Sequence, residues 1–243
     1  MKMTDGRTAT IVDTDGGVDD VLAIRVAESL AQVPLTVTTV GGNVSADQAA
    51  QTVSFMTGLP VHTGLNPYGW QPERRHGIDG VHGAWDGVHR PVEAVDAIDL
   101  IARALTSSSS TIMCLGPLTN LAAALSRVGG ARYVQSPRVF ALGGVEGAPA
   151  GLRDTNRNAD PAASLACANI VSWVSMRHAA ELSAVKMAEI RDSPDYAWIE
   201  PFAERTAQSW GWADRFPVYD VAVVAEALNP ASAVGELIYR AVA

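Results

Sequence analysis

The chain has 243 residues, of which 48% are apolar and 18% are charged. This composition is that of a globular protein with a sizeable core, and it excludes an intrinsically disordered chain. The formal charge of -8 at pH 7 argues against a nucleic-acid partner, because binding to a phosphate backbone needs clustered Lys and Arg.

The chain has no obvious targeting or membrane-spanning segment. Asp5 and Gly6 interrupt the N-terminal stretch, where a signal peptide would need an apolar run of about 7–15 residues. An apolar run of about 18 residues, enough to cross a bilayer, is also missing from the sequence. Cys114 and Cys167 have neither the spacing of a disulfide framework nor that of a zinc site. We therefore expect two buried free thiols in a cytoplasmic protein without a membrane partner.

Strands and helices alternate along the chain. A β-branched run predicts a strand at Thr8–Val12, and apolar spacing predicts a helix at Val18–Leu30. The pattern then continues as strand Leu35–Val40, helix Ala46–Met56, strand Thr111–Leu115, helix Thr119–Arg127 and strand Arg138–Leu142. This alternation predicts an α/β fold with a mostly parallel central sheet and helices on both faces. We expect a single domain over residues 1–243.

Polar loops follow the predicted strands, at residues 13–20, 41–43, 116–117 and 143–158. Because open parallel sheets bind ligands at the carboxyl ends of their strands, these four loops are expected to meet at one site. Residues 64–93 are rich in Gly, His and Trp and have weak periodicity. They predict a long excursion over the same edge of the sheet.

The first of these loops carries the motif DTDGGVDD, with Asp13, Asp15, Asp19 and Asp20. Carboxylates this close raise one another's pKa unless a cation lies among them. An all-oxygen ligand set selects a hard ion, Ca²⁺ or Mg²⁺, over zinc or copper. A structural alternative is that the first two carboxylates accept hydrogen bonds from turn amides while the last two cap the helix. The doubled acidic pair exceeds what capping needs.

These residues resemble a known family. The stretch IVDTDGGVDD is similar to the signature DxDxGxDD of the inosine–uridine nucleoside hydrolases, with Gly16 where a proline is usual. Further stretches resemble family motifs in the family's order: VGGN, VHGAWDG, GPLTNLA, DTNRNADP and YDVAVVA. The resemblance implies a Rossmann-like open sheet of the nucleoside hydrolase type. It also implies hydrolysis of ribonucleosides to free base and ribose, as in purine and pyrimidine salvage.

The resemblance extends to individual site residues. It implies a Ca²⁺ cofactor held by Asp15, Asp20, Asp220 and the backbone carbonyl of Thr119. Asp15 would also take a proton from a Ca²⁺-bound water that attacks an oxocarbenium-like sugar. The residues that fall where the family binds ribose hydroxyls are Asp19, Asn43, Asn156 and, in place of a glutamate, Asp154. Family members are usually dimers or tetramers, so a homodimer or homotetramer is implied.

Three residues are candidates for the nucleobase end of the site. His82 matches a family histidine near the base, and Trp85 could stack on it, although an exposed loop histidine and ordinary packing are the alternatives. Tyr219 stands where the family usually has a histidine that protonates the leaving base. Since a phenol titrates near 10, we predict that Tyr219 stacks or donates a hydrogen bond and that His82 or solvent supplies the proton.

Other features depart from the family or lie outside its motifs. The segment 144–154 has no match for the family's first ribose-site asparagine, and the chain is short between Pro161 and Asp220. Arg74, Arg75 and His76 form a small basic patch that we interpret as a solvated loop, with a phosphate-bearing substrate as the alternative.

Two other function classes fit part of the sequence. A haloacid-dehalogenase-like Mg²⁺ phosphohydrolase would use Asp13 as nucleophile and Asp15 as general acid, but it leaves GPLTN and YDVAVVA unexplained. A non-catalytic nucleoside- or ribose-binding protein would explain Tyr219 and the missing asparagine. Release of free ribose from a nucleoside would distinguish a nucleoside hydrolase from both of these classes.

Overall fold

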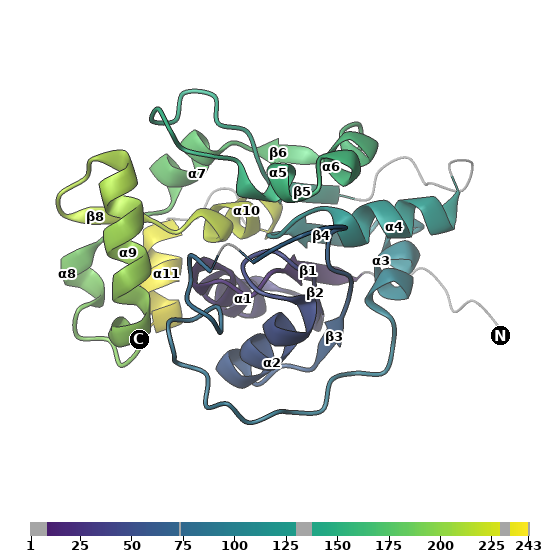
Figure 1. The fold of residues 1–243 in the computed structure, drawn as a ribbon, viewed down its shortest axis with the longest axis horizontal. Helices are drawn as coiled ribbons and strands as arrows, with labels where there is room; N and C mark the ends of the chain where they lie inside the picture. Colours follow the sequence, from purple (N-terminus) through teal and green to yellow (C-terminus); the bar gives the residue numbers. More distant parts are fainter. Residues whose placement is uncertain (1–8, 73, 130–137, 229–233, 243) are drawn as a thin grey trace.

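The computed structural model of the chain describes residues 9–72, 74–129, 138–228 and 234–242. Thr8, the first residue of the first predicted strand, lies outside these ranges. Six parallel strands form the central sheet in the order β3-β2-β1-β4-β5-β6 (Figure 1). Their bounds are β1 Thr10–Thr14, β2 Leu35–Thr39, β3 Val61–Thr63, β4 Thr111–Cys114, β5 Arg138–Leu142 and β6 Ser172–Val174. The predicted α/β class with a parallel central sheet is confirmed.

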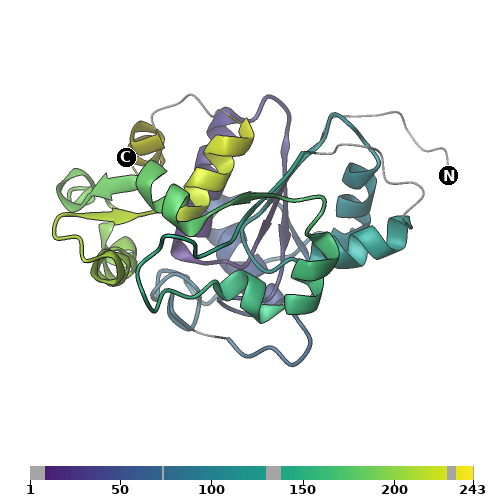
Figure 2. The ribbon, with the colours of Figure 1, turned by 90° about the horizontal axis from the view of Figure 1, so that it is seen from above.

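Helices cover both faces of this sheet (Figure 2). Successive residues of a strand point to opposite faces, so Val12 packs among the helices of one face and Ile11 among those of the other. The first face carries α1 Val18–Leu30, α2 Ala46–Thr57, α7 Met176–Leu182, α10 Tyr219–Leu228 and α11 Val234–Val242. The second carries α3 Ala97–Leu105, α4 Thr119–Val128 and α6 Pro161–Cys167. Both cysteines are buried and free, as predicted.

A second, small sheet lies beside the first. It pairs β7 Ala184–Lys186 with β8 Arg215–Pro217 in antiparallel register and is flanked by α8 Met187–Ile190 and α9 Tyr196–Trp210 (Figure 1). Buried Phe202 and Phe216 pack edge to face, with ring centroids 6.2 Å apart, and so join α9 to β8. Because α9 also contacts α1, this unit brings a helix from late in the chain to the N-terminal end of α1.

Residues 64–96 connect β3 to α3 without a helix or strand in the described part of that segment, which confirms the predicted excursion. The Asp79 carboxylate folds its centre by accepting hydrogen bonds from the backbone N–H groups of Val81, Gly83 and Trp85. The Asp79 carbonyl in turn accepts from the Thr52 hydroxyl at 2.6 Å, which ties the excursion to α2. Among the described residues, none of the helices is long and apolar enough to cross a membrane.

Candidate active site

A cavity of about 320 Å³ opens at the carboxyl ends of the strands. Its walls come from the loops after β1, β2 and β4, where Asp15, Asn43 and Leu115 lie, from Asn156 in the short helix α5 Thr155–Ala159 after β5, and from helix α9. The strand order reverses between β1 and β4, which is the position where open α/β sheets bind their ligands. The predicted meeting of the polar loops at one site is therefore confirmed.

Three carboxylates meet at the N-terminal end of α1. Asp19, Asp20 and Asp220 are buried, and each offers an oxygen within 4.8 Å of the others. Asp20 also has a structural role, because its carboxylate accepts hydrogen bonds from the Thr14 hydroxyl and from two backbone N–H groups of the turn before α1. The capping alternative thus describes Asp20 in part, but it leaves Asp19 and Asp220 unexplained.

The negative charges of this buried cluster have few hydrogen-bond donors beside them among the described residues. Oδ1 of Asp220 is buried without a hydrogen-bond partner among the residues that the structure describes. Burial, followed by repulsion from the neighbouring carboxylates, raises the pKa of Asp15 and Asp220 well above the ordinary value and that of Asp19 to about 8. The cluster therefore favours the uptake of protons or of a cation.

Gly16 shows why this chain departs from the family signature inside the turn. Its φ is 78°, and a Cβ at this position would lie 2.8 Å from Cβ of Ala49. Proline is restricted to a φ near −65°, so it cannot occupy this backbone conformation. The turn before α1 therefore needs glycine here, and the substitution is a feature of the local backbone.

Asp15 is held in place by Asn43. Oδ2 of Asp15 accepts from the Asn43 backbone N–H, and Oδ1 accepts from its side-chain Nδ2, both at 2.9 Å. A Cβ at Gly42 would lie 1.9 Å from Oδ2 of Asp15, so only glycine permits this approach. On the neighbouring wall, Nδ2 of Asn156 donates to the Leu115 carbonyl at 2.6 Å. The predicted Asp15, Asn43 and Asn156 thus lie together on the cavity.

Three other predicted residues do not line the cavity. Thr119 begins α4, and its hydroxyl donates to Asp160 at 2.7 Å. Asp154 caps the short helix α5 Thr155–Ala159 and faces a neighbouring surface pocket. Trp85 is half-buried against the core, and its ring meets that of His89 edge-on at 5.7 Å.

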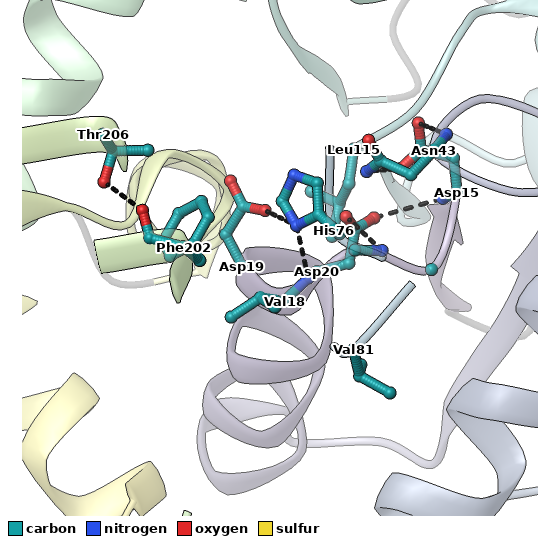
Figure 3. Close-up of polar contacts among 12 residues, drawn as sticks. Asp15, Val18, Asp19, Asp20, Asn43, His76, Val81, Leu115, Phe202 and Thr206 are labelled. Carbon is teal, nitrogen blue, oxygen red and sulfur yellow. Dashed lines mark hydrogen bonds and ion pairs between the residues drawn. The ribbon is translucent and has the colours of Figure 1, made fainter. Parts of the chain in front are cut away.

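His76 reaches the cavity where the sequence predicted His82. His76 is buried and lines the cavity beside Asp19, a residue of the first turn of α1 (Figure 3). His82 lies behind it, with near-parallel rings whose centroids are 6.3 Å apart, and does not line the cavity. The interpretation of His76 as part of a solvated loop was wrong, because contacts from distant parts of the chain bury it.

The environment of His76 keeps it neutral. Nδ1 accepts a hydrogen bond from the Val18 backbone N–H at 2.9 Å, so the single proton of the neutral ring sits on Nε2. Burial, reinforced by the positive charge of Arg205, lowers the pKa of His76 well below its ordinary value. Oδ1 of Asp19 lies 3.9 Å from Nδ1, but a nitrogen without a proton makes no ion pair.

The remaining wall combines Tyr219 with helix α9. Tyr219 is buried and lines the cavity as predicted, and its phenolic oxygen accepts from Nε1 of Trp210 at 2.6 Å. Burial raises the pKa of the Tyr219 phenol, which therefore stays protonated at neutral pH. Phe202, Arg205 and Thr206 line the cavity from α9. Figure 3 shows Phe202 and Thr206 on the side of Asp19 that faces away from Asp15.

A family model described as inosine-uridine preferring nucleoside hydrolase matches residues 10–242. The chain belongs to this family. Family membership excludes the dehalogenase-like alternative, and Asp13 agrees with this. It is fully buried, accepts hydrogen bonds from Thr38 and Asn120 and does not line the cavity, so it cannot attack a substrate there.

Individual relatives match parts of the chain. A probable uridine nucleosidase 2 of Arabidopsis thaliana is 33% identical over 136 residues, which are 49% of this chain and 42% of that protein. An uncharacterized protein of Schizosaccharomyces pombe is 32% identical over 136 residues, 48% of this chain and 43% of its own length. The matched stretch is thus less than half the length of either relative.

Solved structures share the fold. A plant nucleoside hydrolase superposes with a TM-score of 0.75 at 21% identity, covering 92% of this chain and 79% of that one. A purine-preferring ribonucleoside hydrolase from Gardnerella vaginalis gives a TM-score of 0.71 at 20% identity with the same coverage. These similarities confirm that the central sheet and its surrounding helices form a nucleoside hydrolase fold.

Proposed function

We propose that this protein hydrolyses the N-glycosidic bond of ribonucleosides, releasing free base and ribose. The observation that carries the proposal is the cavity itself. Buried carboxylates that need a cation lie beside Asn43 and Asn156, whose amides suit sugar hydroxyls, at the strand-order reversal of a nucleoside hydrolase fold.

The carboxylate cluster fits a divalent cation. The unpartnered Oδ1 of Asp220 and the raised pKa of Asp15 and Asp19 are what a site built around a cation is expected to have without it. The oxygen donors favour a hard ion, and Ca²⁺ is our first candidate. When bound, such an ion lowers the pKa of a coordinated water. We propose Asp15, Asp20 and Asp220 as side-chain ligands, with Asp19 close enough to contribute.

The backbone ligand in this proposal is the carbonyl of Leu115, not that of Thr119. Thr119 opens α4, and carbonyls in the first turn of a helix point toward its C-terminus, away from the carboxyl edge of the sheet. Leu115 follows β4 and lines the cavity, and its carbonyl already accepts from Asn156. A carbonyl has a second lone pair that it can offer to a cation.

Asp15 is the proposed base toward the attacking water. It lines the cavity beside the cluster that is proposed to hold the cation, and its two hydrogen bonds from Asn43 fix its orientation. Carboxylates around the ribose also stabilise the positive charge that develops on the sugar as the base departs. Asp19, Asn43 and Asn156 are the proposed partners of the ribose hydroxyls.

The proposed base end differs from the one expected from sequence. His76, with its proton on Nε2, supplies a neutral hydrogen-bond donor to the base, and His82 supports it from behind. Tyr219 offers a second neutral donor, since its oxygen already accepts from Trp210. Neither group is a strong acid at neutral pH, so the base is held by hydrogen bonds as it leaves.

A reducing-sugar assay over a panel of ribonucleosides, with millimolar Ca²⁺ and with chelator, tests this function. We expect free ribose from at least one nucleoside, loss of activity with chelator, and near-complete loss in Asp15→Asn. Tight nucleoside binding without ribose release would contradict hydrolysis and identify a binding protein. The dimer or tetramer and the cytoplasmic salvage role implied by the family stay predictions.

A further inference from the structure

A second cavity, of about 270 Å³, adjoins the one described above. Four residues line both cavities and place their junction at the proposed sugar end: Asp15, Asn43, Thr155 and Asn156. Figure 3 shows Asp15 and Asn43 on the side of His76 that faces away from Phe202. Of the described residues, those of α9 line only the first of these two cavities. The second cavity therefore extends the site beyond the proposed sugar end, away from the proposed base end.

A tight turn of the 64–96 excursion forms part of the wall of the second cavity. The backbone N–H of Trp70 donates to the Pro67 carbonyl at 3.2 Å, and Gly69 has the φ of 69° that the third residue of a type II turn requires. Tyr68 thereby lies at the tip of the turn, and its side chain is fully exposed. Nε1 of Trp70 donates to the Gly42 carbonyl at 2.9 Å, so the turn is fixed to the loop after β2.

Two amide side chains also line the second cavity, those of Gln71 and of Asn158 in α5. Both residues are exposed, and neither side chain makes a hydrogen bond with another residue that the structure describes. An amide both donates and accepts, which suits hydroxyl groups. The ring of Tyr68 offers a flat apolar face next to them. An aromatic face beside free amides suits a sugar ring, which has an apolar C–H face and a rim of hydroxyls.

The charge of the second cavity does not suit an anion. Among the described residues that line it, Asp15 is the only acidic or basic one. The first cavity differs, because it is lined by Arg75, Arg153 and Arg205. A phosphate group in the second cavity would have no arginine or lysine to pair with among these lining residues. The lining therefore fits an uncharged group.

We propose that the second cavity binds a second sugar ring carried on the 5′ oxygen of the ribose, so that the protein accepts 5′-O-glycosylated ribonucleosides. This substrate class rests on the proposed hydrolase function. The 5′ oxygen can carry a substituent while the base and the vicinal 2′- and 3′-hydroxyls stay free to bind. A volume of about 270 Å³ is near the lower limit of about 300 Å³ for small-molecule sites, which suits one ring and not a second nucleoside.

The covalent steps are those of the proposed function. The C1′–N bond breaks and its electron pair leaves with the base, while the oxygen of water bonds to C1′. One proton of this water stays on the new C1′ hydroxyl, and the other passes to Asp15 and reaches the base through solvent. The O-glycosidic bond at C5′ is unchanged. The products are therefore the free base and a glycosylated ribose.

Calorimetric titration with sugars that carry no base tests the site without turnover. The ligands are 1,4-anhydroribitol, a ribose ring that cannot be hydrolysed, its 5-O-β-glucosyl derivative and its 5-phosphate, each with Ca²⁺ present. We expect the glucosyl derivative to bind about tenfold more tightly than anhydroribitol, through one packed ring face and its hydroxyls. The phosphate should give no such gain. Tyr68→Ala should remove most of the gain, and the variant should fold because this side chain is fully exposed.

Tyr239→Ala is the matched control, because Tyr239 is also an exposed tyrosine but lies on α11 and lines neither cavity. It should leave the gain unchanged. Four outcomes would overturn the proposal. They are no binding of the glucosyl derivative, equal binding of this derivative and anhydroribitol to the wild type, an unchanged gain in Tyr68→Ala, and a larger gain from phosphate than from glucose.

Kinetics separate this proposal from the hydrolase function. The wild type should release base from the 5′-O-β-glucosyl derivative of its best nucleoside with a kcat/KM at least equal to that of the nucleoside itself. Tyr68→Ala should lower the ratio of these two values about tenfold, mainly through KM. Hydrolysis of the nucleoside but not of its glucosyl derivative would contradict the substrate class in an active hydrolase. If the wild type cleaved neither, the proposed function would fail, and calorimetry would still decide whether the second cavity binds a sugar.

Discussion

The backbone N–H of Val18 donates a hydrogen bond of 2.9 Å to Nδ1 of His76, 58 residues further along the chain. This contact joins the first turn of α1 to the 64–96 excursion. It also fixes the tautomer of the ring, because a nitrogen that accepts a backbone proton carries none itself. His76 is thereby prepared to donate one hydrogen bond from Nε2 without becoming charged.

His76→Ala should lower kcat/KM on natural nucleosides by about 100-fold, the usual effect of removing one donor to a developing negative charge. His82→Ala should cost less, because His82 lies behind His76. Steady-state kinetics on uridine and on 4-nitrophenyl riboside check this. The nitrophenyl group leaves readily without help, so His76→Ala should be nearly normal on it. Equal losses on both substrates would assign His76 to holding the turn at Val18.

Tyr219→Phe should keep a substantial part of the activity. Its phenol has a raised pKa and cannot act as a neutral-pH acid, so the variant removes one hydrogen bond and no charge. The Nε1 proton of Trp210 loses its partner, which should lower the free energy of unfolding by about 1 kcal/mol. Urea unfolding and pH–rate profiles measure both effects. Loss of one limb of the wild-type pH–rate profile in Tyr219→Phe would show that Tyr219 donates a proton.

Removal of divalent ions should make stability depend on pH. The pKa of Asp19 is raised from 3.8 to about 8 in the folded protein, so the folded state holds a proton that the unfolded state has lost. The stability that this group contributes is present at low pH and is lost as the pH rises from about 4 to about 8. Asp15 and Asp220, whose pKa values are also raised, act in the same direction. The free energy of unfolding should therefore fall with pH by up to about 1.4 kcal/mol per pH unit for each proton that the folded state retains.

Millimolar Ca²⁺ should flatten this slope and raise the melting temperature at pH 8, because a cation compensates the ionised carboxylates. Asp19→Asn should reduce the slope of the chelated protein. Urea titrations at several pH values, with Ca²⁺ and with chelator, give both slopes. If the two slopes coincide, the cluster does not bind Ca²⁺ under these conditions.

Asp13→Asn should act on stability and leave the kinetics close to wild type. Burial raises the pKa of Asp13 to about 6, although the hydrogen bonds from Thr38 and Asn120 oppose this. As for Asp19, the folded state holds a proton that the unfolded state loses. The contribution of Asp13 to the free energy of unfolding of the wild type, about 3 kcal/mol in total, is therefore lost as the pH rises from about 4 to about 6. Asn has no such titration, so its unfolding free energy should vary less over this range. A large loss of kcat in well-folded Asp13→Asn would place Asp13 in the chemistry.

The local pattern of the sequence predicted the first half of the fold closely. Helix Val18–Leu30 and strand Arg138–Leu142 have the predicted bounds, and the other early elements differ by a few residues at their ends. In these segments apolar periodicity and flanking glycines agree with the tertiary environment. The later short elements were not predicted. Strands of three residues such as Ser172–Val174 and Ala184–Lys186 have too few positions for a periodic pattern.

The site was predictable at its proposed sugar end and less so at its proposed base end. Asp15, Asn43 and Asn156 directly follow strands or lie in motifs, so the topology brings them together. His76 was misjudged because its burial depends on Val18 and Phe202, which are far from it in sequence. Arg205 lies in the middle of α9 without any motif around it. For the excursion that carries His76, the nearest local signal of an ordered loop is the pair Asp79–Gly80, because the Asp79 carboxylate accepts backbone hydrogen bonds that fold this segment.

The two ends of the cavity come from separate stretches of the polypeptide. The proposed sugar end is built mainly by loops of the parallel sheet, whereas α9 packs against the small antiparallel sheet of β7 and β8. Insertion, shortening or replacement of that late segment would therefore change the wall formed by α9 and leave the aspartate turn unchanged. Related proteins can in this way differ in the wall formed by α9 while they keep the aspartate turn in common.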